Sequence, residues 1–236
     1  MQPGLDRATD NRWRSSCRRT CDASLRSPAW GGIALLIAGL TSDSAPTSSW
    51  SDAQIAAWYA HHGNAHWLIS AYLIAAAAPL LLVFTVDLRQ RIAAAGASER
   101  AQTLLTGAGT AFSITVLVGA GLYAAVPAAM TFVDAPPPTP DTSRYLLGAA
   151  YGTLVMFSAV AAALLAATVS ITSLRHPAVP RWLAIAGIPA SLLMLANAAM
   201  PMGIITLWFA TASITLTARS ATARAFAPSA HGAVAA

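Results

Sequence analysis

The sequence contains no lysine and very few charged side chains of any kind. Charged residues make up 10% of its 236 residues and hydrophobic ones 56%, whereas about 25% of a soluble domain is charged. This shortage of polar surface excludes an ordinary soluble domain and favours a protein that crosses a membrane several times. The fourteen basic residues are all arginines, spread over short segments with no contiguous patch. We therefore expect no nucleic-acid partner, despite a net charge of +5.

Reactive and metal-binding side chains are equally scarce. The two cysteines, Cys17 and Cys21, cannot complete a tetrahedral metal site by themselves. No Asp, Glu, Arg or His falls in the middle of an apolar run, although proton-coupled transporters usually need such a group there. The sequence also has no nucleophile elbow, phosphate-binding loop, dinucleotide fingerprint or pair of catalytic carboxylates. We predict a protein without enzymatic activity, catalytic residues or a cofactor.

Long apolar runs predict an all-α membrane helix bundle with about six transmembrane helices. About 20 apolar residues cross the roughly 30 Å of hydrocarbon in a bilayer. The block at 182–218 is nearly twice that length, and Asn197, Pro201 and Gly203 at its middle favour a turn between two spans. The other predicted spans are residues 29–44, 67–86, 104–131 and 145–174.

The first run, residues 29–44, leaves two interpretations open. Its uninterrupted apolar part, Ala29 to Leu40, reaches only about 18 Å as a helix. It can be a short retained span, with Arg26 extending toward the membrane surface. It can also be the core of a cleaved signal peptide, because a basic leader precedes it and small residues follow it. Retention is expected and gives six spans, whereas cleavage gives five.

The arginines fall almost entirely on one side of the predicted spans. Only Arg144 lies in a loop on the other side. Because short basic loops remain in the cytoplasm, both termini are expected to be cytoplasmic. Residues 1–28 and 219–236 are expected to be disordered tails, leaving residues 29–218 as the bundle. The arginines on the cytoplasmic side are Arg7, Arg12, Arg14, Arg18, Arg19, Arg26, Arg89, Arg91, Arg100, Arg175, Arg181, Arg219 and Arg224.

The loop before the second predicted span contains a short amphipathic helix. Ser51 and Gln54 have the spacing of a capping box, which marks the start of a helix. Ile55, Trp58 and Tyr59 then follow on one face of that helix. We expect this apolar face to lie flat on the outer leaflet.

Three of the five histidines belong to the same loop. His62 and His66 have the spacing of a helical zinc pair, but Gly63 and Asn64 between them favour a helix break. His61 would have to supply a third ligand. The alternatives are a pH-sensing cluster and plain interfacial histidines, and we expect the last, with no bound metal.

Two residue pairs have predicted structural roles. Gly148 and Gly152 form a GxxxG step, which lets two helices approach closely. The partner helix can belong to the same bundle or to a second copy of the chain, and the first is expected. Asp87 and Arg91, one helical turn apart at the end of the second span, are expected to form an interfacial ion pair.

The arrangement resembles a broad group of uncharacterised multi-pass membrane proteins from high-GC Gram-positive bacteria. The resemblance rests on the outer helix that ends in Trp58–His62, the Asp87–Arg91 exit from the second span, and the Gly/Ala-rich spans that follow. It implies a bacterial cell (inner) membrane location and this topology, and it supplies no catalytic residues.

These features lead us to expect a non-enzymatic membrane module or complex subunit. Its expected partners are the lipid bilayer and either another membrane protein or a second copy of the chain. The alternatives are a small-molecule transporter or permease component, and an extracytoplasmic sensor of pH or metal built on His61, His62 and His66.

Overall fold

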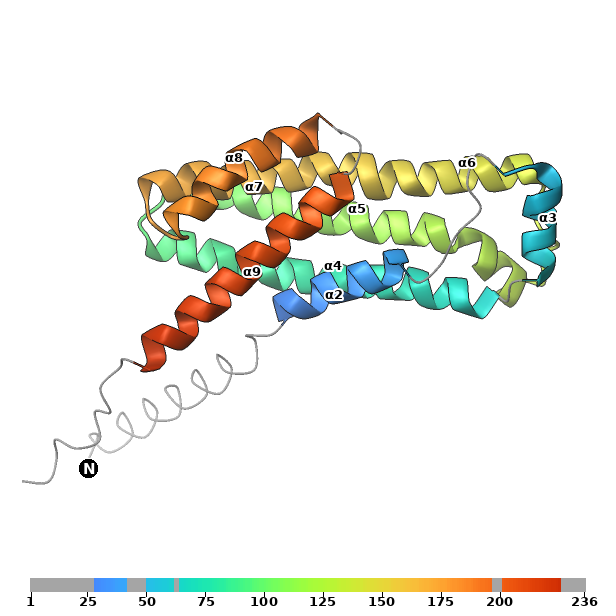
Figure 1. Ribbon diagram of the computed structural model, residues 1–236, viewed down its shortest axis with the longest axis horizontal. Coiled ribbons are helices and arrows are strands. Elements are labelled where there is room, and N and C mark those ends of the chain that lie inside the picture. The colour runs from blue at the N-terminus through green and yellow to red at the C-terminus, as the bar shows by residue number, and fades with distance from the viewer. Residues whose placement is uncertain (1–27, 42–49, 62–63, 197–200, 226–236) are drawn as a thin grey trace, which may run out of the picture.

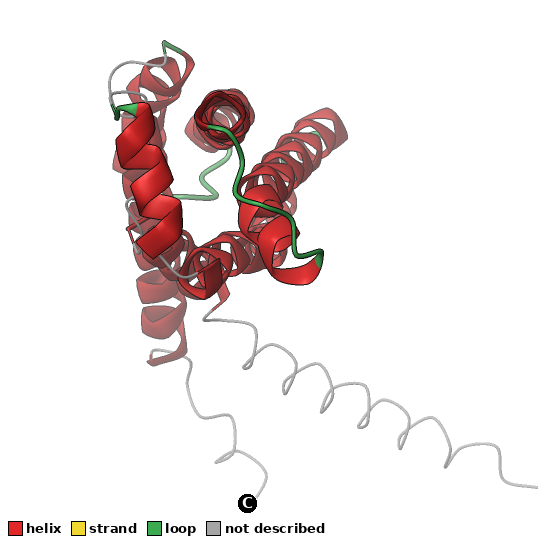
Figure 2. Cartoon of the chain, turned by 90° about the vertical axis from the view of Figure 1, so that its right-hand side faces the viewer, coloured by secondary structure: helices red, strands yellow, loops and turns green. Residues whose placement is uncertain are grey.

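The computed structural model describes residues 28–41, 50–61, 64–196 and 201–225. These residues form helices joined by short connections, with no strand among them (Figure 1, Figure 2). The helices are α2 (Pro28–Thr41), α3 (Asp52–His61), α4 (Asn64–Ala94), α5 (Glu99–Phe132), α6 (Pro140–Tyr151), the π-helix η1 (Gly152–Phe157), α7 (Ser158–Arg175), α8 (Arg181–Leu195) and α9 (Pro201–Ala225).

Three long helices form the centre of the bundle. They are α4, α5 and the continuous helix made by α6, η1 and α7. α5 packs against both of the others and lies between them (Figure 1). Within the described ranges, these three are the helices long and apolar enough to cross a membrane. The prediction of an all-helical bundle is confirmed for the described residues, and the length and apolar composition of these three helices are consistent with a membrane protein.

The ends of the long helices follow from local sequence. Ser98 and Thr139 cap α5 and α6, because their side-chain oxygens accept hydrogen bonds from backbone N–H groups of the first turn. Gly96, with a φ of 83°, makes the turn between α4 and α5. Polar residues extend the start of each helix and the end of α4, whereas Phe132 and Arg175 extend the ends of α5 and α7 by one residue, so each helix is longer than its predicted apolar run.

α2 lies antiparallel to α4 and contacts it through glycines. A Cβ on Gly32 would come within 2.9 Å of the Leu80 Cβ, and one on Gly39 within 2.9 Å of the Ser70 carbonyl oxygen. Small residues therefore bring the two helices together, as expected for helices in lipid. The 14 residues of α2 extend about 21 Å, which is less than the hydrocarbon thickness of a bilayer.

The last apolar block is divided into two helices, as its length and helix-breaking residues predict. α8 ends at Leu195 and α9 begins at Pro201, and the two helices pack against each other. The 15 residues of α8 extend about 22 Å, so α8 is also shorter than a full span. The described residues therefore contain three full-length candidate spans together with shorter apolar helices, and the prediction of six spans is not confirmed.

The last helix extends past the predicted end of the bundle at residue 218. α9 continues to Ala225, because alanine and arginine after residue 218 are good helix formers. Residues 219–225, which belong to the predicted tail, are therefore part of α9. Residues 1–27 and 226–236, which belong to the predicted tails, lie outside the described residues.

The two ends of the bundle carry different charges. The α4–α5 and α7–α8 connections lie at the same end, where a Cβ on Gly96 would be 4.0 Å from His176 Nδ1. α3 and the start of α6 lie at the opposite end, which we call the capped end and which carries Arg144 (Figure 1). This separation is the one that the arginine pattern predicts for these loops. The first end, which we call the basic end, carries Arg89, Arg91, Arg100, Arg175 and Arg181.

Candidate functional site

α3 covers the capped end and lies across the ends of the long helices (Figure 1). The capping box is formed, since Ser51 N donates to Gln54 Oε1 at 2.8 Å and Gln54 N donates to Ser51 Oγ at 3.3 Å. Ile55, Trp58 and Tyr59 are at most 6% exposed. The predicted apolar face therefore exists, but it packs on the protein and does not lie on the outer leaflet. The apolar ends of the long helices give it a surface to cover.

Arg144 of α6 links the segments that meet at the capped end. One terminal nitrogen of its guanidinium donates to Asp52 Oδ1 at 2.7 Å and to the Trp50 carbonyl oxygen at 2.9 Å. The other donates to Asp141 Oδ1 at 3.2 Å. The one arginine predicted to lie opposite the others therefore fastens the start of α3 to α6.

Aromatic side chains fill the space beneath α3. The rings of Trp58 and Trp67 meet edge to face at 5.1 Å, and those of Trp67 and Tyr123 at 5.6 Å. The hydroxyl groups of Tyr59 and Ser143 share a buried hydrogen bond of 2.6 Å. Burial raises the pKa of Tyr59, and the hydrogen bond to Ser143 partly opposes that rise. These contacts tie α3 to α4 and α6, and α4 in turn to α5.

The loop histidines that the structure describes do not belong to a cluster that could bind a metal ion. His61 and His66 are exposed, and His62 lies outside the described residues. No group of three His, Cys, Asp or Glu side chains that could hold a metal ion occurs in the part of the chain that the structure describes.

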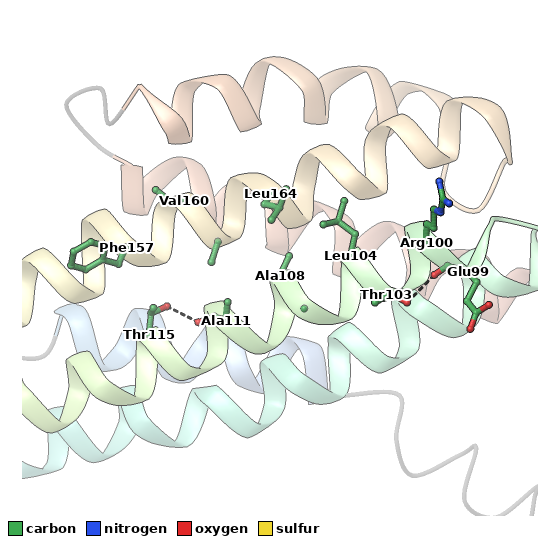
Figure 3. A pocket seen from close by; sticks show the side chains of 12 residues that line it. Glu99, Arg100, Thr103, Leu104, Ala108, Ala111, Thr115, Phe157, Val160 and Leu164 are labelled. Carbon is green, nitrogen blue, oxygen red and sulfur yellow. Dashed lines mark hydrogen bonds between the residues drawn. The ribbon is translucent and has the colours of Figure 1, made fainter.

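A groove of about 1110 Å³ runs along the bundle between α5 and the η1–α7 segment (Figure 3). Its floor on α5 is a row of small residues spaced four apart, with Leu104 and Ala108 beside the row, and a Cβ on Gly107 there would meet no atom within 4 Å. The threonine hydroxyls of the floor donate to carbonyl oxygens of their own helix at 2.8–3.0 Å. The floor therefore offers an open, apolar strip to the membrane. These floor residues are Thr103, Gly107, Ala111 and Thr115.

The wall of the groove is bulky and rises from η1 and α7. Phe157, Val160 and Leu164 form it, and all are at least 44% exposed. The π-helical turn η1 packs against α5, where a Cβ on Gly119 would lie 3.1 Å from Leu154 N and overlap the leucine side chain. Such turns are frequent at functional sites. The groove was not predicted, because its floor and wall lie far apart in the sequence.

Charged side chains occur in the groove only at its basic end. Glu99 and Arg100 line it there, at the start of α5. Figure 3 shows the Arg100 side chain directed toward α7 and the Glu99 side chain directed away from it. No ion pair joins either of them to another residue within the described ranges.

The two predicted residue pairs differ in outcome. Arg91 Nε donates to Asp87 Oδ2 at 2.8 Å, which is the ion pair expected at the end of the second span. A Cβ on Gly148 or Gly152 would meet no atom within 4 Å. Packing of this GxxxG step against another helix of the bundle is therefore not seen among the described residues, and a contact with a second copy stays a prediction.

Buried polar atoms gather where α7, α8 and α9 meet. Ser170 Oγ and Trp208 Nε1 are buried and have no hydrogen-bond partner among the residues described. Both lie beside Gly187 of α8, where a Cβ would overlap Ser170 and come 3.0 Å from the Trp208 nitrogen. Sequence reasoning did not identify this cluster, because single serines and tryptophans are common in apolar helices.

Comparison with known proteins assigns no family or function to these sites. No protein-family model matches the chain, and no curated protein or solved structure matches it.

Proposed function

We propose that this protein is a non-enzymatic subunit of a membrane complex, which docks another transmembrane helix in the groove between α5 and η1–α7. The observation that carries the proposal is the combination of a small-residue floor with a bulky apolar wall. Helices in lipid associate by close packing, and small residues let their backbones approach. The floor from Thr103 to Thr115 is about 18 Å long, and the groove continues to Glu99 for a total of about 24 Å, which matches most of a membrane span.

The same proposal includes a topology. We place the basic end in the cytoplasm, because short basic loops favour that side. α2, α8 and α9 then complete a bundle of six membrane-embedded helices with both termini cytoplasmic. The close packing of α2 on α4 supports α2 as a retained helix. The resemblance to proteins of high-GC Gram-positive bacteria supports a bacterial cell membrane location.

The test compares two glycine variants of α5. Gly107 and Gly121 are both exposed, and a Cβ on either would meet no atom within 4 Å. Gly107→Leu fills the groove, whereas Gly121→Leu alters a separate groove between α4 and α5. Tagged chains are extracted gently from the native membrane, and the co-purified membrane proteins, differently tagged copies included, are quantified by mass spectrometry. We expect wild type and Gly121→Leu to retain a stoichiometric partner that Gly107→Leu loses. Equal capture by all three chains would reject the groove as the docking site.

A transporter or permease component is the second candidate, and the polar atoms beside Gly187 favour it. Ser170 and Trp208 offer hydrogen-bonding groups to a small polar molecule inside an otherwise apolar bundle. A thermal-shift screen of the purified protein tests this candidate. A substrate that protects wild type but not Ser170→Ala would support transport, and no protection by any compound class would count against it.

A further inference from the structure

We infer that the helix docked in the groove is α5 of a second copy of this chain, held at the basic end by two reciprocal Glu99–Arg100 ion pairs. This inference rests on the proposed function, and it names the partner of the same groove.

Glu99 and Arg100 lie on opposite flanks of the groove floor. An α-helix turns about 100° per residue, so relative to Thr103 the Glu99 side chain is offset by about 40° to one side and that of Arg100 by about 60° to the other. The opposite directions of the two side chains in Figure 3 agree with this geometry. The floor that begins at Thr103 is therefore bordered by an acid on one flank and a base on the other.

A twofold axis pairs these flanks with each other. Two copies of one chain enter a membrane in the same orientation, because the same arginine bias acts on both. A symmetric dimer then has its axis along the membrane normal, and each residue faces its counterpart at equal depth. When two parallel helices face each other across such an axis, the left flank of one meets the right flank of the other. Glu99 of each copy then lies opposite Arg100 of the other, in the same way as flanking charges pair in parallel coiled coils.

The shape of the groove fits this arrangement. Gly107 and Ala111 let the two α5 helices approach closely along the floor. The wall residues Phe157, Val160 and Leu164 would then contact the flank of the partner's α5. A lipid chain needs no small-residue floor, and an unrelated helix would have no reason to carry the matching charges at the matching depth.

Each charge also has a role within its own chain. Glu99 lies in the first turn of α5, where an acid is favourable for the helix dipole, and Arg100 belongs to the basic end. Neither role requires an acid and a base to border the floor on opposite sides. The dimer surface inferred here also differs from the predicted GxxxG step, since Gly148 and Gly152 do not line the groove.

Cysteine cross-linking in membranes locates the contact. In a chain with Cys17→Ser and Cys21→Ser, single cysteines are placed by Gly107→Cys and Ala111→Cys on the floor. Leu192→Cys is the control, because Leu192 is 61% exposed on α8 and lies at a similar distance from the basic end. A disulfide needs Cα atoms within about 7 Å. We expect oxidation to link two copies through residue 107 or 111 and not through residue 192.

Charge reversal tests the identity of the partner. Glu99→Arg or Arg100→Glu alone places like charges opposite each other, and we expect either to weaken dimerisation about tenfold, from two exposed pairs of up to about 1 kcal/mol each. The double variant Glu99→Arg/Arg100→Glu is expected to restore wild-type dimerisation. The double variant still lacks Glu99 in the first turn of α5. If the single variant lost dimerisation only because α5 was destabilised, the double variant would lose it as well. The differences should shrink in high salt.

The outcomes separate this inference from the proposed function. Floor cross-links together with rescue by the double variant support both. Absence of self-cross-links, with a different protein captured by wild type and lost from Gly107→Leu, would overturn the second copy and leave the groove as a docking site. Co-purification of lipid alone would overturn both. Floor cross-links that form equally well in the single charge-reversal variants would show that the reciprocal ion pairs do not hold the dimer, and would overturn the inference.

Discussion

Tyr59→Phe is expected to loosen the capped end while leaving the helices beneath it in place. The substitution removes one hydroxyl and keeps the ring that packs with Trp58 and Trp67. Its partner, Ser143 Oγ, is fully buried and loses a hydrogen bond of 2.6 Å. Because that bond joins α3 to α6, its loss acts on the docking of α3.

The size of the effect follows from burial. A lost hydrogen bond costs about 0.5–1.5 kcal/mol, and a buried hydroxyl left without its partner raises the total to about 1–3 kcal/mol. Ser143 can turn back to a carbonyl oxygen of its own helix, which favours the lower part of that range, about 1–2 kcal/mol. Ser143→Ala should cost a similar amount. The double variant Tyr59→Phe/Ser143→Ala removes both polar groups and should cost little more than one substitution, a coupling of about 1 kcal/mol.

Hydrogen exchange measured by mass spectrometry reads this out locally. A loss of 1–2 kcal/mol corresponds to exchange of the α3 amides about 5- to 30-fold faster in each single variant. The α8 amides, which belong to a helix that begins at the basic end, provide the internal control and should not change. Single effects that add fully in the double variant, or α3 exchange that stays at the wild-type rate, would refute the claim that this bond holds α3 in place.

Two further predictions concern packing and pH. Gly119→Leu should lower stability by about 1–3 kcal/mol through overlap with Leu154, whereas Gly121→Leu should be nearly neutral. Thermal unfolding would show this, and equal effects would contradict the η1–α5 contact. Because the pKa of Tyr59 is raised above its ordinary value of 10.0, its contribution to α3 docking is complete below pH 10 and lost as the pH rises above it. Alkaline hydrogen exchange of α3 should show that loss in wild type and not in Tyr59→Phe, and an identical response in both would contradict it.

The long helices could be predicted because their signal is local and strong. Apolar composition over about 20 residues is sufficient to place α4, α5 and the α6–α7 helix. The capping box of Ser51 and Gln54 and the ion pair of Asp87 and Arg91 depend on spacings of three and four residues, which the sequence displays directly.

The remaining features depend on contacts between distant segments. Arg144 meets Asp52 across 92 positions of the chain, and only the fold brings them together. Charge pattern correctly set Arg144 apart from the other arginines but could not name its partner. Hydrophobic pattern likewise marked the apolar face of α3, but it could not distinguish burial against protein from burial in lipid. The groove floor did carry a signal, small residues spaced four apart from Thr103, but its wall came from another helix.

Native mass spectrometry of the protein released from its own membrane into mild detergent shows whether two copies associate through α5. We expect a species of twice 24.3 kDa in wild type and in the double charge variant, and mainly the single chain in Gly107→Leu and in either single reversal. A single 24.3 kDa chain in every sample, with only lipid attached, would show that α5 does not dock a second copy.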